Sequence, residues 1–303
     1  MAGLKEIKNR LKSVMNTRKI TYAMKLVSAA KLQKAQASVV RSREYTRSLQ
    51  RIVESLSTEL QGSDLAHPLM ETRAAVKRVR ILVVGGSRGL CGGYNSNVNR
   101  KVEATIAEIR SQYPSADIDA VLVGRKPAEY FRRVKRPILR SYEALPEEPA
   151  QWPIEEICSE LEAAFIRGEV DQVRLVFTQF KSALNQTVLS EQLLPVAATF
   201  SSSGISSNSS GAQESTGSVT LFEPSAERVF SAILPRLVRS RVYQAALDAR
   251  ASEHGSRMAA MDAATKNAGD LAHSLKLLRN KVRQSTITSD LLDIIGGAEA
   301  LNG

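Results

Sequence analysis

The C-terminal part of the chain, from about residue 236 to residue 295, contains no proline and carries a heptad-like repeat. As an α-helix it would extend roughly 90 Å, because a helix rises about 1.5 Å per residue. The repeat alternates steps of four and three residues through Leu247, Ala251, His254, Met258, Met261, Thr265, Ala268, Ala272, Leu275, Arg279 and Val282. A globular core does not need a helix of that length, whereas a coiled coil does.

The N-terminal segment, residues 1–62, supplies a partner for this helix, since it is also helical in pattern and lacks proline. Its apolar seam starts with Leu4, Ile7, Leu11 and Val14 and then thins to alanines. Small side chains along a seam let two helices approach closely. We therefore expect the two ends of the chain to pair, and everything between them to be carried on the pair.

Positive charge is concentrated in the same N-terminal segment. The net charge is +11, and residues 1–53 hold thirteen Lys and Arg against only Glu6 and Glu44, which accounts for the whole excess. Such a helix must face water, nucleic acid, an anionic membrane or an acidic protein surface. Nucleic-acid binding is an alternative without a recognised motif to support it. No apolar run approaches 18 residues, so no inserted or membrane-spanning helix is expected.

Residues 76–197 alternate between strand and helix patterns. Strands are predicted at 80–84, 118–123, 138–142, 173–177 and 187–193, and helices at 95–113, 129–132 and from 153 to 167. This alternation is typical of a small doubly wound, Rossmann-like α/β domain. The predicted fold class is thus α/β plus long helices.

Two segments complete the predicted organisation. Residues 201–218 are dominated by Ser, Gly and Asn, which predicts a flexible insertion. Residues 221–303 form the C-terminal helical segment, with a kink or a new start at Pro235. Its helix is predicted to end at Gly296-Gly297.

A glycine-rich loop, residues 85–95, follows the first predicted strand, where a dinucleotide-binding loop would lie. Its spacing fits neither G-x-G-x-x-G nor a P-loop, so a structural turn or protein contact is preferred and a nucleotide-dependent enzyme is the alternative. Glu147-Glu148 and Glu155-Glu156 are interpreted as a solvated loop and a helix N-terminus rather than as catalytic carboxylates. Cys91, Cys158 and the histidines show no nucleophile or metal pattern. We expect no catalytic residue, cofactor or metal.

Five stretches together resemble the gamma subunits of F-type ATP synthases. They bracket the chain from residue 7 to residue 301 and include both predicted coiled-coil segments and the glycine-rich loop. The stretches are residues 7–32, Arg88-Gly89-Leu90-Cys91-Gly92-Gly93-Tyr94-Asn95, residues 256–268, residues 280–288 and residues 294–298.

The resemblance implies an antiparallel, left-handed coiled coil of the terminal helices that turns as a rotor inside a ring of alpha and beta subunits. It couples transmembrane ion flow to ATP synthesis or hydrolysis at beta, with the epsilon subunit and the membrane c-ring as further partners and no nucleic acid. The expected location is the cytoplasmic face of a bacterial plasma membrane. The residues that match contact positions are, for the alpha/beta ring, Met24, Lys25, Arg283, Gln284 and Thr288, and, for the c-ring and epsilon, Leu221, Phe222 and Glu223.

Three positions depart from the family pattern, one of them Asp290, which stands where Glu is common. Ser87 stands where Asp is usual, and Gly255 stands where a better helix former is usual. A glycine in a helix interior costs roughly 1 kcal/mol relative to alanine, so Gly255 is expected to weaken the C-terminal helix locally.

Overall fold

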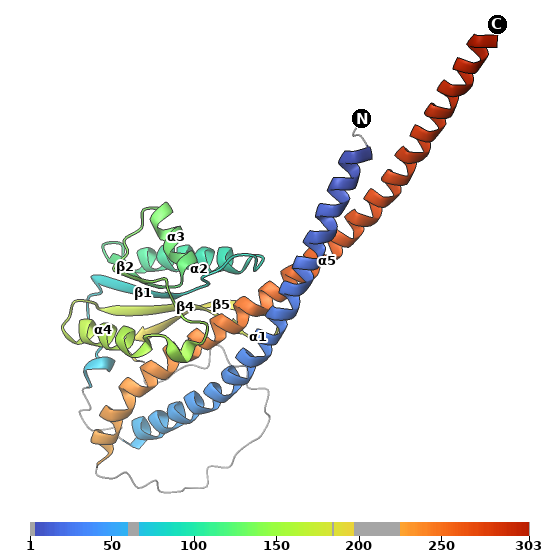
Figure 1. The fold of residues 1–303 in the computed structure, drawn as a ribbon. Helices are drawn as coiled ribbons and strands as arrows, with labels where there is room; N and C mark the ends of the chain where they lie inside the picture. The colour runs from blue at the N-terminus through green and yellow to red at the C-terminus, as the bar shows by residue number, and fades with distance from the viewer. Residues whose placement is uncertain (1–3, 60–66, 184, 197–224, 303) are drawn as a thin grey trace.

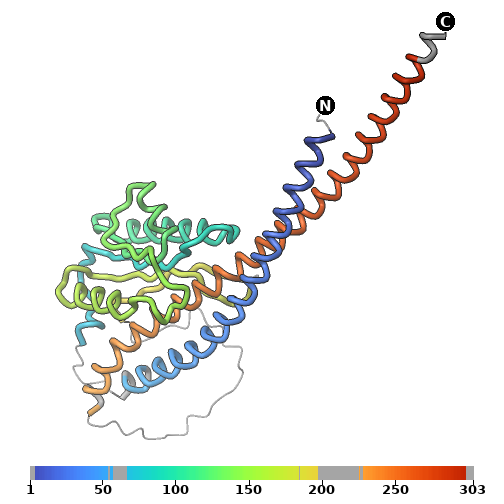
Figure 2. The backbone as a smooth tube through the Cα atoms, in the orientation of Figure 1, coloured from blue at the N-terminus to red at the C-terminus, as the bar shows by residue number. Residues whose placement is uncertain are grey.

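The computed structural model describes residues 4–59, 67–183, 185–196 and 225–302. Two long helices, α1 (Leu4–Glu59) and α5 (Ala226–Asn302), lie side by side as a shaft, and an α/β head sits beside one half of it (Figure 1). At the other end, α5 continues past the N-terminus of α1 as a single helix (Figure 2). The predicted combination of long terminal helices with an α/β domain is confirmed.

The two shaft helices run antiparallel in one constant register. Near one end, Leu11 packs with Leu275. Further along, the hydroxyls of Thr21 and Thr265 lie 2.8 Å apart, and those of Thr46 and Ser240 lie 2.7 Å apart. From the first hydroxyl pair to the second, α1 advances 25 residues and α5 goes back 25 residues. Because 25 residues make about seven helical turns, both pairs lie on the same face of each helix, inside the seam.

The head contains a five-stranded sheet of order β3-β2-β1-β4-β5. Four neighbouring strands are parallel, and β5 is an antiparallel edge strand that pairs with β4. The strands are β1 (Arg78–Val84), β2 (Asp117–Val123), β3 (Arg140–Tyr142), β4 (Gln172–Phe180) and β5 (Gln186–Leu194). The helices are α2 (Tyr94–Gln112), α3 (Arg125–Arg133) and α4 (Ile154–Ile166), and two 3-10 turns are η1 (Pro68–Met70) and η2 (Pro149–Gln151).

Each face of the sheet has its own hydrophobic core, as in a doubly wound domain. One core packs α2 and α3 against the sheet, with Val102 of α2 and Phe131 of α3 nearly inaccessible to solvent. The other packs α4 together with both shaft helices, and Phe165 of α4, Leu56 of α1 and Leu237 of α5 are fully buried there. The shaft is therefore part of the head's own core.

Of the predicted features of the C-terminal helix, the end at Gly296-Gly297 is wrong, and of the two alternatives at Pro235 the new start is excluded. The helix neither restarts at Pro235 nor ends at Gly296, because α5 runs without interruption from Ala226 to Asn302. The proline lacks an N–H for the helix, but its neighbours Leu234 and Leu237 are fully buried in the head's core, so packing outweighs the lost bond. Neither terminal glycine adopts the left-handed conformation that commonly ends a helix.

Gly255 has a packing role that offsets its low helix propensity. A Cβ at this position would lie 2.9 Å from the side-chain nitrogen of Gln186 and 3.4 Å from the Cα of Ala183. Gln186 itself accepts a 2.7 Å hydrogen bond from the Ser256 hydroxyl. The missing side chain thus lets α5 pass close to the β4–β5 hairpin, an effect that local propensity does not include.

The hydroxyl pair of Thr46 and Ser240 provides a test of the register. Each Ala substitution leaves a buried hydroxyl without its partner across the seam, so Thr46→Ala and Ser240→Ala should each lower the free energy of unfolding by about 1–2 kcal/mol. The double variant should lose less than the sum. Urea unfolding of the full chain measures all three, with Ser48→Ala as a control, since that exposed hydroxyl bonds only within α1. Fully additive losses would contradict a direct interaction.

Candidate functional site

The glycine-rich loop between β1 and α2 lies against α5. The backbone oxygen of Gly89 accepts two 3.3 Å hydrogen bonds from the Arg257 guanidinium. A Cβ on Gly92, which has a φ of +56°, would lie 3.8 Å from the Cβ of Ala260. Just after the loop, the Tyr94 hydroxyl donates to the backbone oxygen of Ala249 at 3.1 Å. The loop therefore contacts the shaft helix through the Gly89 oxygen and Gly92, while the backbone oxygens of Gly86 and Arg88 accept hydrogen bonds from within the head.

The other residues of this motif have distinct surroundings. Arg88 is largely exposed and lies 3.8 Å from Glu147, whereas Cys91 is buried. Burial raises the pKa of the Cys91 thiol, although the charge of Arg257 opposes this effect. A protonated, enclosed thiol is suited to packing rather than to nucleophilic attack. Gly93 precedes the first residue of α2 and caps that helix.

A set of charged residues joins the shaft to the head, and we call it the shaft–head cluster. Its members are Arg250, Glu253, His254 and Arg257 of α5 and Glu147 of the loop before η2. Glu253 is 1% exposed and accepts hydrogen bonds from Arg250 at 2.7 Å and from Arg257 at 2.5 Å. A buried carboxylate is stable only with such compensation, so both arginines are held in place.

Glu147 connects this cluster to the second shaft helix. Its carboxylate lies 2.8 Å from Arg250, 3.1 Å from His254 and 3.1 Å from Lys31 of α1. Glu147 does lie in a loop, as interpreted from the sequence, and its side chain is 37% exposed. The sequence did not reveal that this one carboxylate bridges the head and both shaft helices. The sequence does contain a signal for this cluster. Arg250, Glu253 and Arg257 are spaced by three and four residues and therefore lie on one helix face. Glu147, the partner of Arg250 in the head, lies 103 residues earlier in the chain.

Two groups of the cluster have displaced pKa values. Burial lowers the pKa of His254 to about 4, with a further contribution from the charge of Arg250. Burial alone would raise the pKa of Glu147, but the charge of Arg250 and the hydrogen bond and charge of Lys31 outweigh it and lower that pKa. At neutral pH the imidazole is therefore uncharged and the carboxylate is ionised.

Of the two predicted contact residues on α1, Lys25 has a partner within the shaft. Its ammonium donates a 2.6 Å hydrogen bond to Asp262 of α5, and this bond raises the pKa of Lys25 and lowers that of Asp262. Both side chains remain about one third exposed, so the ion pair is accessible from outside. Met24 is half-buried beside it.

The remaining predicted contacts lie on the projecting part of α5 or outside the described residues. Arg283, Gln284 and Thr288 are exposed, and the Thr288 hydroxyl bonds to the backbone oxygen of Gln284 at 3.0 Å. Leu221, Phe222 and Glu223, and the predicted insertion at 201–218, fall outside the described residues. Several large apolar side chains of this part are at least half exposed: Ile287, Leu291, Leu292, Ile294 and Ile295.

The described part of the chain offers neither a candidate membrane span nor a candidate metal site. None of its helices has both the length and the hydropathy that crossing a bilayer requires. No three His, Cys, Asp or Glu side chains within it are grouped so that they would hold a metal ion.

Solved structures with the same fold belong to rotary ATP synthases. The chain is similar to one from the central stalk and c-ring of the Tetrahymena thermophila mitochondrial ATP synthase, with a TM-score of 0.56, 22% identity, and coverage of 81% of this chain and 99% of that one. It is also similar to one in a Euglena gracilis mitochondrial OSCP/F1/c-ring structure, with a TM-score of 0.59, 16% identity, and coverage of 98% and 94%. The chain thus shares its fold with chains of these ATP synthase assemblies.

Sequence comparison identifies the family. The protein-family model described as ATP synthase matches residues 3–301 of this chain. The ATP synthase gamma chain of Heliobacterium modesticaldum is 41% identical, covering 99% of this chain and 100% of the relative, and that of Synechococcus elongatus is 39% identical, covering 100% of both. The chain belongs to the ATP synthase gamma-chain family. It is a non-catalytic subunit of an ATP synthase, as the sequence resemblance predicted.

Glu253 offers a test of the shaft–head cluster. Glu253→Gln removes the negative charge between two buried arginines, so it should lower the free energy of unfolding by about 3 kcal/mol. Glu160→Gln is a matched control, because Glu160 pairs with Arg140 on the surface and an exposed pair contributes less than about 1 kcal/mol. Denaturant unfolding measures the loss in free energy of unfolding for both variants. Equal losses would contradict a special role of Glu253.

The depressed pKa of His254 predicts a pH dependence of stability. The unfolded chain binds a proton near pH 6.5, whereas folded His254, which faces Arg250, Arg257, Glu253 and Glu147, binds one only near pH 4. The stabilisation that depends on a neutral imidazole is therefore fully present above pH 6.5. The free energy of unfolding falls by on the order of 3 kcal/mol as the pH drops toward 4.

This loss should be smaller in His254→Gln and unchanged in His273→Gln, since His273 is exposed on the projecting side of the shaft. Urea midpoints measured at intervals between pH 4 and pH 7 give the comparison. Parallel curves for the wild type and His254→Gln would show that other groups cause the pH dependence.

Proposed function

We propose that α1 and α5 turn as one shaft inside a ring of alpha and beta subunits and couple transmembrane ion flow to ATP synthesis or hydrolysis at beta. The observation that carries this proposal is the projecting part of α5, which exposes a run of large apolar side chains from Ile287 to Ile295. An exposed apolar patch on a single helix is typical of a surface that another protein covers. A ring of alpha and beta subunits around α5 would cover these side chains.

The proposed contacts with the ring fall into two levels. Arg283, Gln284 and Thr288 would meet beta near the projecting end of the shaft, and Met24 and Lys25 would meet the acidic lower loops of beta. The positive charge of α1 supports the second contact, since charge complementarity gives attraction and orientation without tight interlocking. Loose contact of this kind suits a shaft that must turn.

The foot of the shaft is proposed to meet the membrane c-ring and the epsilon subunit through Leu221, Phe222 and Glu223. The enzyme would then stand at the cytoplasmic face of a bacterial plasma membrane, with this chain held there through the c-ring rather than by its own insertion. The charge of α1 serves protein contacts in this proposal, and nucleic acid is not a partner.

Co-expression with alpha and beta subunits tests the proposal. A stable complex that contains one copy of this chain per ring, and that loses ATPase activity when the chain is omitted, is the expected result. Purification of the chain alone, without affinity for the ring, would contradict it.

A variant at the projecting end tests the proposed upper contact. Arg283→Ala combined with Gln284→Ala should lower the ATPase rate of the assembled complex several-fold and leave assembly intact, because truncated polar contacts chiefly affect the interface. Lys281→Ala, an exposed cation two residues away, is the control. Turnover of the double variant at the wild-type rate would remove both residues from the interface.

A further inference from the structure

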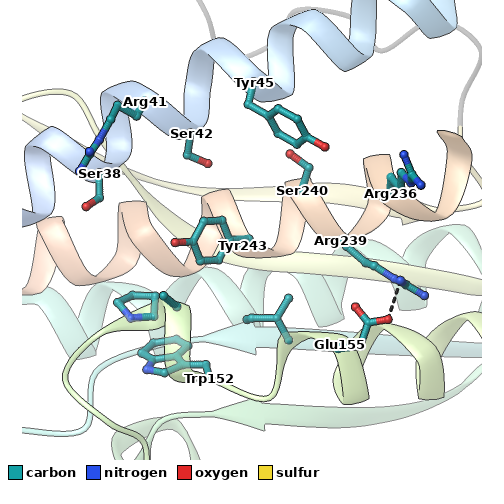
Figure 3. A pocket seen from close by; sticks show the side chains of 13 residues that line it. Ser38, Arg41, Ser42, Tyr45, Trp152, Glu155, Arg236, Arg239, Ser240 and Tyr243 are labelled. Atoms are coloured by element: carbon teal, nitrogen blue, oxygen red, sulfur yellow. Dashed lines mark ion pairs between the residues drawn. The ribbon is translucent and has the colours of Figure 1, made fainter.

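A groove runs between the shaft and the head, on the side where α1, α5 and the η2–α4 segment meet (Figure 3). Its volume is about 790 Å³. Aromatic and guanidinium side chains dominate its lining: Tyr45, Trp152, Tyr243, Arg41, Arg236 and Arg239. Arginine, tyrosine and tryptophan are the residues that most often carry the binding energy of protein–protein interfaces.

The positive charges of this groove are only partly balanced. Arg239 pairs with Glu155 at 2.5 Å. Arg41 donates through Nε to the backbone oxygen of Ala37 at 3.3 Å, and within the described part of the chain no carboxylate forms an ion pair with it or with Arg236. Figure 3 shows Arg41 and Arg236 toward opposite ends of the groove, with Tyr45 and Tyr243 between them.

At a neighbouring cavity, the cations on this face of α1 are paired with carboxylates. That cavity, of about 260 Å³, shares Ser38, Pro149 and Tyr243 with the groove. There the chain's own Glu147-Glu148 lies against α1, with Lys31 3.1 Å from Glu147 and Lys34 paired with Glu148. The same helix face, about two turns further on, presents Arg41, for which the described residues supply no such carboxylate.

We propose that the groove binds an acidic polypeptide segment of a partner protein, with carboxylates at its two ends and an apolar or aromatic side chain between them. The carboxylates would pair with Arg41 and Arg236, and the apolar side chain would pack between Tyr45 and Tyr243. An extended ligand is favoured because the two unpaired guanidinium groups are separated and Tyr45 is 56% exposed, whereas small-molecule sites enclose most of their ligand.

The position of the groove determines how such a partner would move. All of its walls belong to one chain and come from both shaft helices and the head. A bound segment would therefore turn with the shaft and stiffen the junction between shaft and head. This last step rests on the proposed rotor function, but the binding itself does not.

The experiment uses the full chain and a fluorescein-labelled peptide of sequence Glu-Glu-Leu-Phe-Glu-Glu. Fluorescence anisotropy should give saturable binding that weakens with salt and is lost when glutamines replace the four glutamates. Arg41→Glu combined with Arg236→Glu should weaken binding by on the order of tenfold, since it turns two attractions into repulsions. Arg47→Glu is the matched control, because Arg47 is an exposed cation of α1 outside the groove.

Several results would overturn the proposal. Equal weakening by Arg47→Glu would indicate attraction to the basic helix as a whole, and unchanged binding to the double variant would place the peptide elsewhere. Displacement of the peptide by low concentrations of pyrophosphate would indicate a small-anion site. Sedimentation showing a dimer that the double variant disperses would assign the groove to a second copy of the chain. None of these results bears on ring assembly, which tests the rotor proposal separately.

Discussion

The antiparallel packing of α1 on α5 in a single register is the constraint on which the rest of the structure depends. Helices with alanine-rich seams can slide, since small side chains interlock weakly and one heptad resembles the next. Here two hydroxyl pairs, Thr21–Thr265 and Thr46–Ser240, tie the helices at the same offset, and the ion pair Lys25–Asp262 agrees with it to within one residue. A polar group inside a seam contributes little net energy but strongly disfavours every other register. The position of every residue along the shaft follows from this offset.

The head is fixed to the shaft by apolar burial and by charge together. Leu56 and Leu237 complete the hydrophobic core on one face of the sheet. Apolar burial stabilises the contact between head and shaft but does not fix its orientation, because the hydrophobic effect is non-directional. The shaft–head cluster fixes the orientation of the head on the shaft. Glu253 pairs with Arg250 within α5, and Glu147 of the head pairs with Arg250 of α5 and Lys31 of α1. The glycine-rich loop is part of the same junction. Its position after β1 resembles that of a phosphate-binding loop, yet its backbone oxygen at Gly89 is bonded to Arg257, so the shaft fills the place beside it.

The division of the molecule into a paired part and a single-helix part gives each a different role. In the paired part, each helix covers the seam of the other, and the outer surface carries the basic side chains of α1 together with exposed apolar ones such as Ile20, Leu26 and Val27. Beyond the start of α1, α5 exposes apolar side chains that nothing in the described chain covers. The proposed contacts with the ring and the proposed acidic partner in the groove use these two kinds of surface, apolar at the projecting end and cationic beside the head.

The sequence by itself determined the long helices, the alternating strands and helices of the head, and the family, because heptad spacing, strand runs and motifs are local patterns. It also showed where positive charge gathers. Only the tertiary structure decided the constant register, the bridging role of Glu147, the passage of α5 through Pro235 and the reason for Gly255. Each of these depends on a partner distant in the chain: Arg250 and Lys31 for Glu147, the head's core around Leu234 for Pro235, and Gln186 for Gly255. Local propensity describes what a segment prefers alone, whereas burial and ion pairing are set by what lies across from it.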